Sequence, residues 1–149
     1  MAKTLGYMVT WTTYGTWLQG DERGYVQKGK ILGENPKLKK ANIDSMPRNE
    51  VRLDKKQKEI VKEAILKEAE KAGKRILALA VCSNHVHIVL RYDGKPLEKA
   101  VGRLKDTARV ALQLGGFIGR VWARGFDNRY CFDEKSLKNR IDYVQKHER

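Results

Sequence analysis

The strongest constraint on the fold is a pair of neighbouring apolar segments in the middle of the chain. Residues 76–82 form a continuous apolar run, Ile-Leu-Ala-Leu-Ala-Val-Cys, which suits a central strand. Residues 85–90 form a second strand, and the turn Ser83-Asn84 separates the two. Because the connection is so short, we expect the two strands to pair as a hairpin. The chain is therefore expected to fold around a β-sheet.

One helix is expected before this hairpin in the sequence and another after it. The first should begin at Asp54, an N-cap with Gln57 in the capping-box position, and end at Gly73. The second should begin with Pro96 at its first position and stop at Gly115-Gly116. Each helix has one apolar face, formed by Ile60, Val61, Ala64, Ile65 and Ala69 in the first helix and by Leu97, Val101, Leu104, Ala108 and Ala111 in the second.

The order of the elements indicates the fold class. A strand is expected at residues 5–13, followed by an irregular excursion up to residue 52. Residues 120–123 and 129–132 are expected to form a short strand pair, and a final helix should begin at about residue 133. Up to the last strand this is the β-α-β-β-α-β order of a ferredoxin-like sheet. We therefore predict an α+β fold with an antiparallel sheet, helices on one face, a further C-terminal helix, and a single domain over residues 1–149.

The charge of the chain favours a nucleic-acid partner. Its 149 residues include 31 Lys and Arg against 18 Asp and Glu, which gives a formal net charge of +13. Such a surface suits a phosphate backbone, although a Lys-rich solvated surface has the same composition. No segment has the roughly 20 apolar residues of a membrane helix, and no signal peptide precedes the first strand, so a cytoplasmic location is expected. The isolated cysteines, Cys82 and Cys131, are expected to be reduced and buried.

The segment His85-Val86-His87 carries the most chemical information. Side chains in a strand alternate between the two faces of a sheet, so His85 and His87 should project from one face. Val86 and the apolar residues at 88 and 90 should project from the other face into the core. Two imidazoles on an open sheet face are well placed to share one metal ion. The alternative is that they are two polar residues on a solvated face.

The third histidine of the chain lies in the predicted C-terminal helix. His147 follows Tyr143 by four residues, so the two side chains share a helix face and are about 40° apart. The apolar stripe of this helix is centred roughly 120° from Tyr143. It consists of Leu137, Ile141 and Val144. Tyr143 is therefore not an obvious core residue, and it lies beside a third potential metal ligand.

In this combination the chain resembles the single-tyrosine HUH transposases. These are the small transposases of single-strand insertion sequences and their domesticated relatives associated with repetitive extragenic palindromes. The resemblance rests on the His-x-His motif, the ferredoxin-like order and one helical tyrosine near the C-terminus. It covers nearly the whole chain and extends to residues 11–24, Asn84-His-Val-His87, Lys105-Asp-Thr-Ala-Arg109, Val121-Trp122 and Ile141-Asp-Tyr-Val144.

The resemblance implies an enzyme of DNA transposition that cleaves and transfers single-stranded DNA, with a hairpin, through a 5′-phosphotyrosine intermediate. It implies that Tyr143 is the nucleophile, with Tyr130 on a predicted strand as a weaker rival. It also implies that His85 and His87 bind a divalent cation, Mg²⁺ or Mn²⁺. The family's third ligand is a Gln or Asn four residues after the tyrosine, where this chain has His147. A nitrogen ligand there favours Mn²⁺ or another transition metal. Gln145 is an alternative ligand on another side of the helix. Members of the family act as dimers or monomers, so a homodimer is one expected assembly.

DNA binding would combine phosphate contacts with base stacking. The candidate phosphate contacts are Lys105 and Arg109 on the second helix and Arg120, Arg124 and Arg129 around the last strands. The candidate stacking platforms are Trp11, Tyr14 and Trp17. Packing of the first strand and its loop is an equally weighted role for these aromatic residues.

Other functions compete with this one. Ferredoxin-like sheets often bind RNA through aromatic residues on the open face, so a non-catalytic nucleic-acid-binding module is the main alternative. Here that face carries histidines, and no aromatic pattern of that kind is evident. Two-histidine phosphodiesterases need two separate His-x-Ser/Thr elements, whereas this chain has one His-x-His. A structural protein with a histidine-bound metal is a further alternative. Metal-dependent nicking of a single strand separates the enzyme from the binding module.

Overall fold

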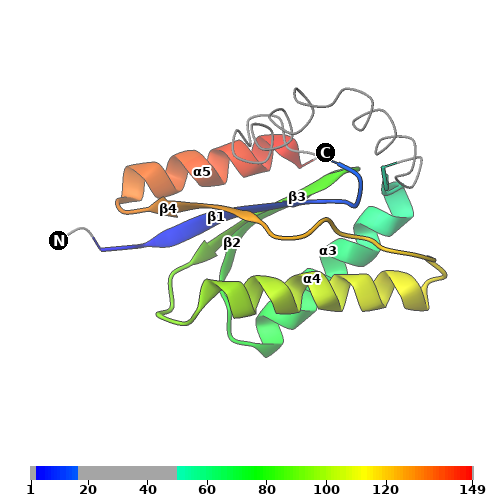
Figure 1. Ribbon diagram of the computed structural model, residues 1–149. Coiled ribbons are helices and arrows are strands. Elements are labelled where there is room, and N and C mark those ends of the chain that lie inside the picture. Colours follow the sequence, from blue (N-terminus) through cyan, green and yellow to red (C-terminus); the bar gives the residue numbers. More distant parts are fainter. Residues whose placement is uncertain (1–2, 17–49, 149) are drawn as a thin grey trace, which may run out of the picture.

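A computed structural model describes residues 3–16 and 50–148 of the chain. Its elements follow one another as β1 (Gly6–Thr12), α3 (Lys55–Lys71), β2 (Ile76–Val81), β3 (His85–Arg91), α4 (Leu97–Leu114), β4 (Asp127–Cys131) and α5 (Glu134–His147). The strands form an antiparallel sheet in the order β2-β3-β1-β4 (Figure 1). The predicted α+β fold with its antiparallel, ferredoxin-like sheet is confirmed.

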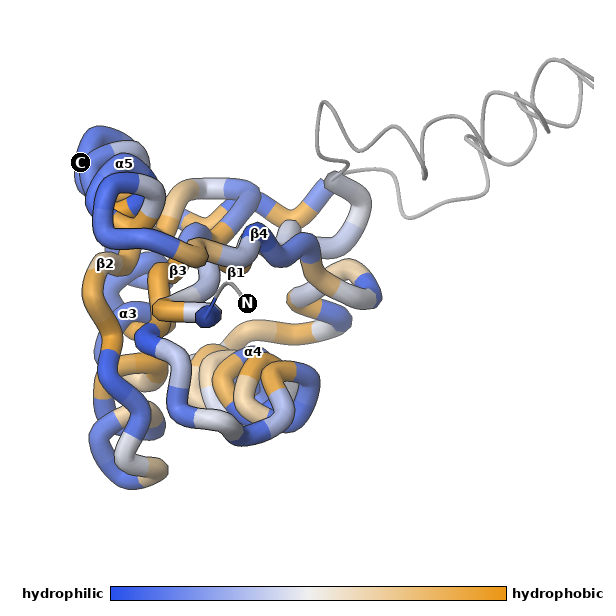
Figure 2. Tube along the Cα trace, turned by 90° about the vertical axis from the view of Figure 1, so that its left-hand side faces the viewer, coloured by the Kyte–Doolittle hydropathy of each residue, from blue (hydrophilic) through white to orange (hydrophobic). Residues whose placement is uncertain are grey.

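The sheet separates two layers of helices, as Figures 1 and 2 show from two directions. α3 and α4 pack together on one face, and α5 covers the other. The larger core lies under α3 and α4, where Val9, Trp11 and Ile88 are at most 1% exposed. A smaller core lies under α5, where Leu137 and Val144 pack on the opposite face of the strands. The two layers follow from the alternation of side chains along each strand.

Local signals set the helix boundaries. The Asp54 carboxylate accepts a hydrogen bond from the N–H of Gln57 at 2.8 Å, and the Gln57 side chain accepts one from the N–H of Asp54 at 2.9 Å, so the predicted capping box is confirmed. Gly73, with φ of +71°, follows the end of α3 as expected. α4 begins one residue later than predicted, with Pro96 as its N-cap. Across the two described ranges, no helix is long and apolar enough to cross a membrane.

The predicted hairpin between β2 and β3 is confirmed. The two strands pair in the antiparallel sense, with Val81 opposite Val86. The turn closes through a hydrogen bond of 2.8 Å from the N–H of Cys82 to the carbonyl of His85. The hairpin therefore fixes where β3 begins and, with it, the position of the first histidine.

The predicted strand pair between residues 120–123 and 129–132 is wrong. Both segments instead run along the same edge of β1. β4 pairs with β1, and the N–H of Ala123 donates to the carbonyl of Thr12 at 3.0 Å. Gly125, with φ of +77°, lies between the two segments. The edge of β1 offers backbone partners along its whole length, so each segment pairs with β1 and not with the other.

The sheet face that carries His85 and His87 is not open, contrary to the prediction. α5 packs across all four strands of this sheet. The same face carries Val89, which is fully buried in the smaller core. Apolar residues at these positions must be shielded from water, and the apolar stripe of α5 shields them. The histidine pair therefore lies at a helix–sheet interface, where His87 is only 6% exposed.

Candidate metal centre and active site

Three histidines and a tyrosine meet where the start of β3 faces the last turn of α5. The ring centroids of His85 and His87 lie 4.6 Å apart, those of His87 and His147 lie 4.9 Å apart, and those of His85 and His147 lie 6.3 Å apart. The Tyr143 ring lies 4.4 Å from the His147 ring and 5.5 Å from the His87 ring. The structure thus brings together the residues that the sequence predicts as metal ligands and nucleophile.

Two periodicities produce this convergence. His85 and His87 lie two residues apart in β3, so both point towards α5, while Val86 between them is buried in the core under α3 and α4. Tyr143 and His147 lie one turn apart in α5, so they share a face. Their neighbour Val144 packs on the sheet and is fully buried. Docking of α5 through this apolar stripe therefore places the Tyr143–His147 face beside β3.

Each of the three histidines has an oxygen atom within hydrogen-bond distance of its Nδ1. Nδ1 of His85 lies 2.7 Å from Oδ1 of Asn84, and Nδ1 of His147 lies 2.8 Å from the carbonyl oxygen of Tyr143. Both of these oxygens are acceptors, so both Nδ1 atoms carry the proton. Nδ1 of His87 lies 2.8 Å from the hydroxyl of Thr10, which can accept in the same way. Among the described residues no hydrogen bond uses the Nε2 of any of these rings. This is the usual arrangement of a metal-binding histidine, in which an oxygen fixes the tautomer and leaves the other nitrogen free.

The electrostatics of the cluster favour neutral imidazoles. Burial, together with the nearby His85 and His147, lowers the pKa of His87 to about 4, and burial is the largest of these causes. Burial, followed by the charge of His147, also lowers the pKa of His85. Desolvation and like charge both disfavour the imidazolium form. Neutral imidazole is the form that binds a metal ion, so both rings are in the competent state near neutral pH.

The spacing of the rings can be compared with that of bound ligands. Two imidazoles that bind one ion through nitrogen at about 2.1 Å have ring centroids about 4.5–5.2 Å apart. The pairs His85–His87 and His87–His147 meet this spacing, whereas the His85–His147 pair, at 6.3 Å, exceeds it. In the described ranges, no group of three or more His, Cys, Asp or Glu side chains is arranged so that it could hold a metal ion as it stands. His147 is the last residue of α5, and its ring would have to lie about 1 Å closer to the His85 ring to reach this spacing. The donor set, three imidazoles with oriented tautomers, fits a divalent transition metal.

Tyr143 is accessible beside this cluster. Its side chain is 43% exposed, although its ring contacts two histidine rings. An accessible hydroxyl next to a cation site is what attack on a bound phosphate requires. The rival, Tyr130, lies on β4 and stacks on Phe132 at 6.0 Å on the edge of the sheet. None of the three histidine rings is within ring-contact distance of Tyr130 among the described residues.

The three aromatic residues predicted to stack on bases differ in their placement. Trp11 is 1% exposed and packs edge-to-face on Trp122 at 5.9 Å, so the prediction that it offers a stacking platform is wrong. It points with Val9 into the larger core because both have the same parity along β1. Tyr14 is half-buried, and the guanidinium of Arg120 lies 4.8 Å above its ring. Trp17 lies outside the described residues.

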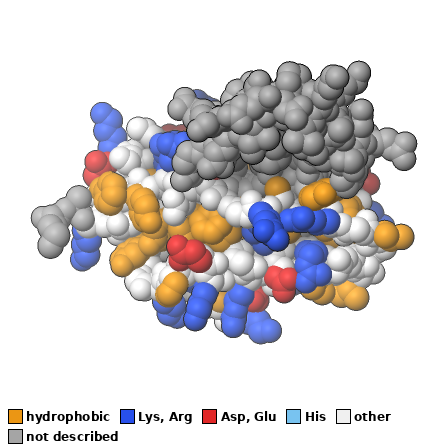
Figure 3. All heavy atoms as spheres, viewed as in Figure 1, with side chains coloured by type: hydrophobic (Ala, Val, Ile, Leu, Met, Phe, Trp, Pro, Cys, Tyr) orange, Lys and Arg blue, Asp and Glu red, His pale blue; other side chains and the backbone are white. Residues whose placement is uncertain are grey.

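The predicted phosphate-binding residues also fall into two kinds. The Lys105 ammonium donates to the carbonyl oxygens of Ala123 and Gly125, both at 2.9 Å, and its pKa is lowered by burial and by Arg120. Lys105 thus ties α4 to the segment before β4. Arg120, Arg124 and Arg129 are exposed, and Arg129 is paired with Asp127. Arg109 is half-buried and paired with Asp106. Figure 3 shows Lys and Arg side chains spread across one face, with a row along the lower edge, where α4 lies.

The structure also shows residues that the sequence reading missed. Thr10 lies directly opposite His87 in the register of β1 and β3, and Thr12 lies opposite His85. Asn84, noted only as part of a turn and a motif, orients the His85 ring. Polar residues at 10 and 12, alternating with apolar ones at 9 and 11, were a readable signal of a polar patch on one face of β1.

Fold and site together define a class, namely a ferredoxin-like α+β protein with a histidine pair on the sheet and a tyrosine-bearing helix across it. Residues 45–147 match a family described as transposases of the IS200-like type. The chain belongs to this family of IS200-like transposases. Among functionally curated protein sequences, none matches the chain significantly.

The solved structures that share the fold include two transposases. The first is a REP-associated tyrosine transposase bound to a REP hairpin, with 14% identity and a TM-score of 0.56. The match covers 95% of this chain but 65% of that one, so this chain spans less than two thirds of its relative. The second is a proposed transposase from Deinococcus radiodurans, with 14% identity, a TM-score of 0.54, and coverage of 99% of this chain and 94% of that one. At this identity the likeness is one of fold alone.

Proposed function

We propose that this chain cleaves and rejoins single-stranded DNA in transposition, through a divalent cation held by His85, His87 and His147 and a covalent bond to Tyr143. The observation that carries the proposal is the meeting of three oriented imidazoles and one accessible tyrosine at the β3–α5 interface. Membership in the IS200-like transposases supports DNA as the substrate. The hairpin bound by the REP-associated relative supports a single strand with a hairpin as the form of that DNA.

The chain's own residues have separable roles in this reaction. The Nε2 atoms of the three histidines would hold Mn²⁺ or Mg²⁺, which when bound stabilises negative charge on the scissile phosphate. The phenolic oxygen of Tyr143 attacks the phosphorus and loses its proton. A bond from Tyr143 to phosphorus forms, and the bond to the 3′ oxygen breaks, which leaves a 5′-phosphotyrosine and a free 3′-OH. A second 3′-OH then displaces the tyrosine, so the strand is rejoined without ATP.

Basic side chains along the sheet edge formed by β4 and the segment before it would hold the DNA backbone. Arg120, Arg124 and Arg129 are exposed around β4 and the segment before it. Arg120 also covers Tyr14, which follows the end of β1 next to the start of β3. An unpaired base would stack on Tyr14 while Arg120 contacts a phosphate. Lys105 is not expected to make such a contact, because its half-buried ammonium group already donates to two carbonyl oxygens.

The test is a search for a covalent protein–DNA adduct. The wild-type chain is incubated with labelled single-stranded hairpin oligonucleotides of randomised flanks and Mn²⁺ or Mg²⁺, and adducts are separated under denaturing conditions. We expect an adduct with the wild type and none with Tyr143→Phe. Tyr130→Phe is the matched control, because Tyr130 is also about half exposed, and it should retain the adduct. An adduct that persists in Tyr143→Phe would refute the assignment, and its loss in Tyr130→Phe would assign the covalent bond to Tyr130.

A further inference from the structure

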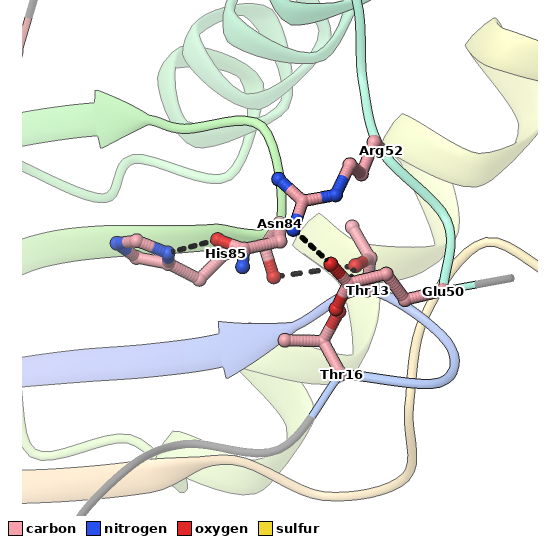
Figure 4. A network of polar contacts seen from close by, with 6 residues as sticks. All are labelled: Thr13, Thr16, Glu50, Arg52, Asn84 and His85. Carbon is pink, nitrogen blue, oxygen red and sulfur yellow. Dashed lines mark hydrogen bonds and ion pairs between the residues drawn. The ribbon is translucent and has the colours of Figure 1, made fainter.

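A chain of polar contacts connects the turn before His85 to the corner at the end of β1 (Figure 4). The hydroxyls of Thr13 and Thr16 lie 2.9 Å apart. The Thr16 hydroxyl donates to Oε2 of Glu50 at 2.7 Å, and Glu50 is ion-paired with Arg52. At the other end, the Thr13 hydroxyl lies 3.3 Å from the carbonyl oxygen of Asn84. Figure 4 shows Glu50 and Arg52 on one side of this chain and His85 on the other.

The Glu50 carboxylate gives this chain of contacts a direction. An ionised carboxylate only accepts, so the Thr16 proton must point to Glu50. The Thr16 oxygen is then left as an acceptor for the single hydroxyl proton of Thr13. That proton is donated to Thr16 at 2.9 Å, with the Asn84 carbonyl at 3.3 Å as a weaker second acceptor, so the two threonines form an ordered relay. The stronger link from Thr13 to Asn84 is the backbone N–H of Thr13, which donates to the same carbonyl at 3.0 Å.

The relay is buried, so its loss is not compensated by water. Thr13 is fully buried and Thr16 is 8% exposed. A buried hydroxyl that loses its partner is unfavourable, so removal of one member of the relay should shift the turn that the relay holds. Backbone bonds join the same places, since the N–H of Thr13 donates to the Asn84 carbonyl at 3.0 Å and the N–H of Leu53 donates to the Ser83 carbonyl at 2.7 Å. Both carbonyl groups of the Ser83-Asn84 turn are thus held by the segments that carry the relay.

The Ser83-Asn84 turn orients the ring of His85. Oδ1 of Asn84 accepts the Nδ1 proton of His85 at 2.7 Å, which keeps the lone pair of the ring on Nε2. Resting on the metal site proposed above, we propose that Glu50, Thr16 and Thr13 are positioning residues that fix the tautomer and direction of the His85 ring. They touch neither the cation nor DNA in this role and act only through Asn84.

The alternative is that Glu50, Thr16 and Thr13 only stabilise the chain at the end of β1. In that case their substitution would change the free energy of unfolding but neither the tautomer of His85 nor the affinity of the folded protein for a metal. The variants are Thr16→Val, which removes the hydroxyl at nearly constant volume, and Thr16→Ser, which retains it. Glu50→Gln keeps an accepting oxygen, whereas Glu50→Ala does not. Thr107→Val, on α4 and half-buried, controls for removal of a hydroxyl elsewhere.

The first measurement uses metal-free protein. ¹⁵N NMR of the histidine rings at pH 8 reports which nitrogen carries the proton. We expect the His85 ring to be protonated on Nδ1 in the wild type, Thr16→Ser, Glu50→Gln and Thr107→Val. In Thr16→Val and Glu50→Ala we expect a mixture of tautomers. If Thr16→Val does not fold, Glu50→Ala decides, because the Glu50 side chain is on the partly exposed side of the relay.

The second measurement is the Kd for Mn²⁺ alone, by titration calorimetry. We expect Thr16→Val and Glu50→Ala to raise the Kd about tenfold, with Thr16→Ser and Glu50→Gln within about twofold of wild type. Unchanged tautomers and an unchanged Kd in both disrupting variants, with only a lowered unfolding midpoint, would overturn the positioning role. A wild-type protein that binds no Mn²⁺ would instead refute the proposed metal site, while the NMR result still decides the role of the relay.

Discussion

Val144→Ala should loosen α5 without loosening the rest of the fold. Val144 is fully buried under α5 in the smaller core, beside Leu137. The substitution removes two buried methyl groups, each of which stabilises the docked helix by about 0.8 kcal/mol. The cavity that they leave raises the total loss of stabilising free energy to about 2 kcal/mol. Because α5 is the only helix of the described residues on this face, most of the loss falls on its docking and little on the core under α3 and α4.

The assay is hydrogen exchange of backbone amides in metal-free protein. A loss of about 2 kcal/mol lowers the equilibrium constant for docking of α5 on the sheet roughly 30-fold. We therefore expect the α5 amides to exchange about 30-fold faster in Val144→Ala, through local opening of the helix. Addition of Mn²⁺ should slow them again, because the proposed ligands His85 and His87 come from β3 and His147 from α5, so that bound metal favours the docked helix.

Val101→Ala provides the matched control. Val101 lies on α4 and is also fully buried, but in the larger core. The same two methyl groups are removed, so the free energy of unfolding should fall by a similar amount, yet the α5 amides should respond no more than those of α3 and α4. If Val144→Ala accelerates exchange equally in α4 and α5, then α5 does not open on its own and this reasoning is wrong.

Three further perturbations follow from contacts elsewhere in the structure. Gly6→Ala should lower the unfolding free energy in urea, because a Cβ there would lie 2.7 Å from a backbone carbonyl of β3 and 2.9 Å from Leu137, and the loss should be reflected in faster α5 exchange. Lys105→Met should cost about 1–3 kcal/mol of stability by removing the donor of two carbonyl groups, with the salt dependence of single-strand DNA binding little changed. A clear drop in that salt slope would instead place Lys105 on a phosphate. In metal-free protein, His87 should make the unfolding free energy fall as the pH drops from 6.5 towards 4, since its pKa is lowered to about 4 in the folded state and the unfolded chain takes up the proton first. The difference between wild type and His87→Gln should show this slope, and a difference independent of pH would contradict it.

Much of the fold was readable from local signals. The capping box at Asp54, the glycine after α3 and the apolar stripes of the helices depend on residues within a few positions of one another. The hairpin of β2 and β3 needed only two apolar runs and a short turn. The pairing of strands at the β1 edge of the sheet could not be predicted from local signals. Residues 120–123 and 129–132 each pair with β1, more than 100 residues earlier in the chain, and no local pattern encodes that choice.

In the candidate site, too, some features follow from local sequence and others only from the tertiary structure. By itself the sequence determined that His85 and His87 share a strand face and that Tyr143 and His147 share a helix face, because side-chain direction within one element follows from its periodicity. Only the tertiary structure decided that these two faces meet, since this depends on α5 covering the histidine side of the sheet. It also decided that Thr10 lies against His87 and that Glu50 reaches Thr16, because contacts between distant segments depend on strand register and helix docking, which are settled by the packing of the whole core.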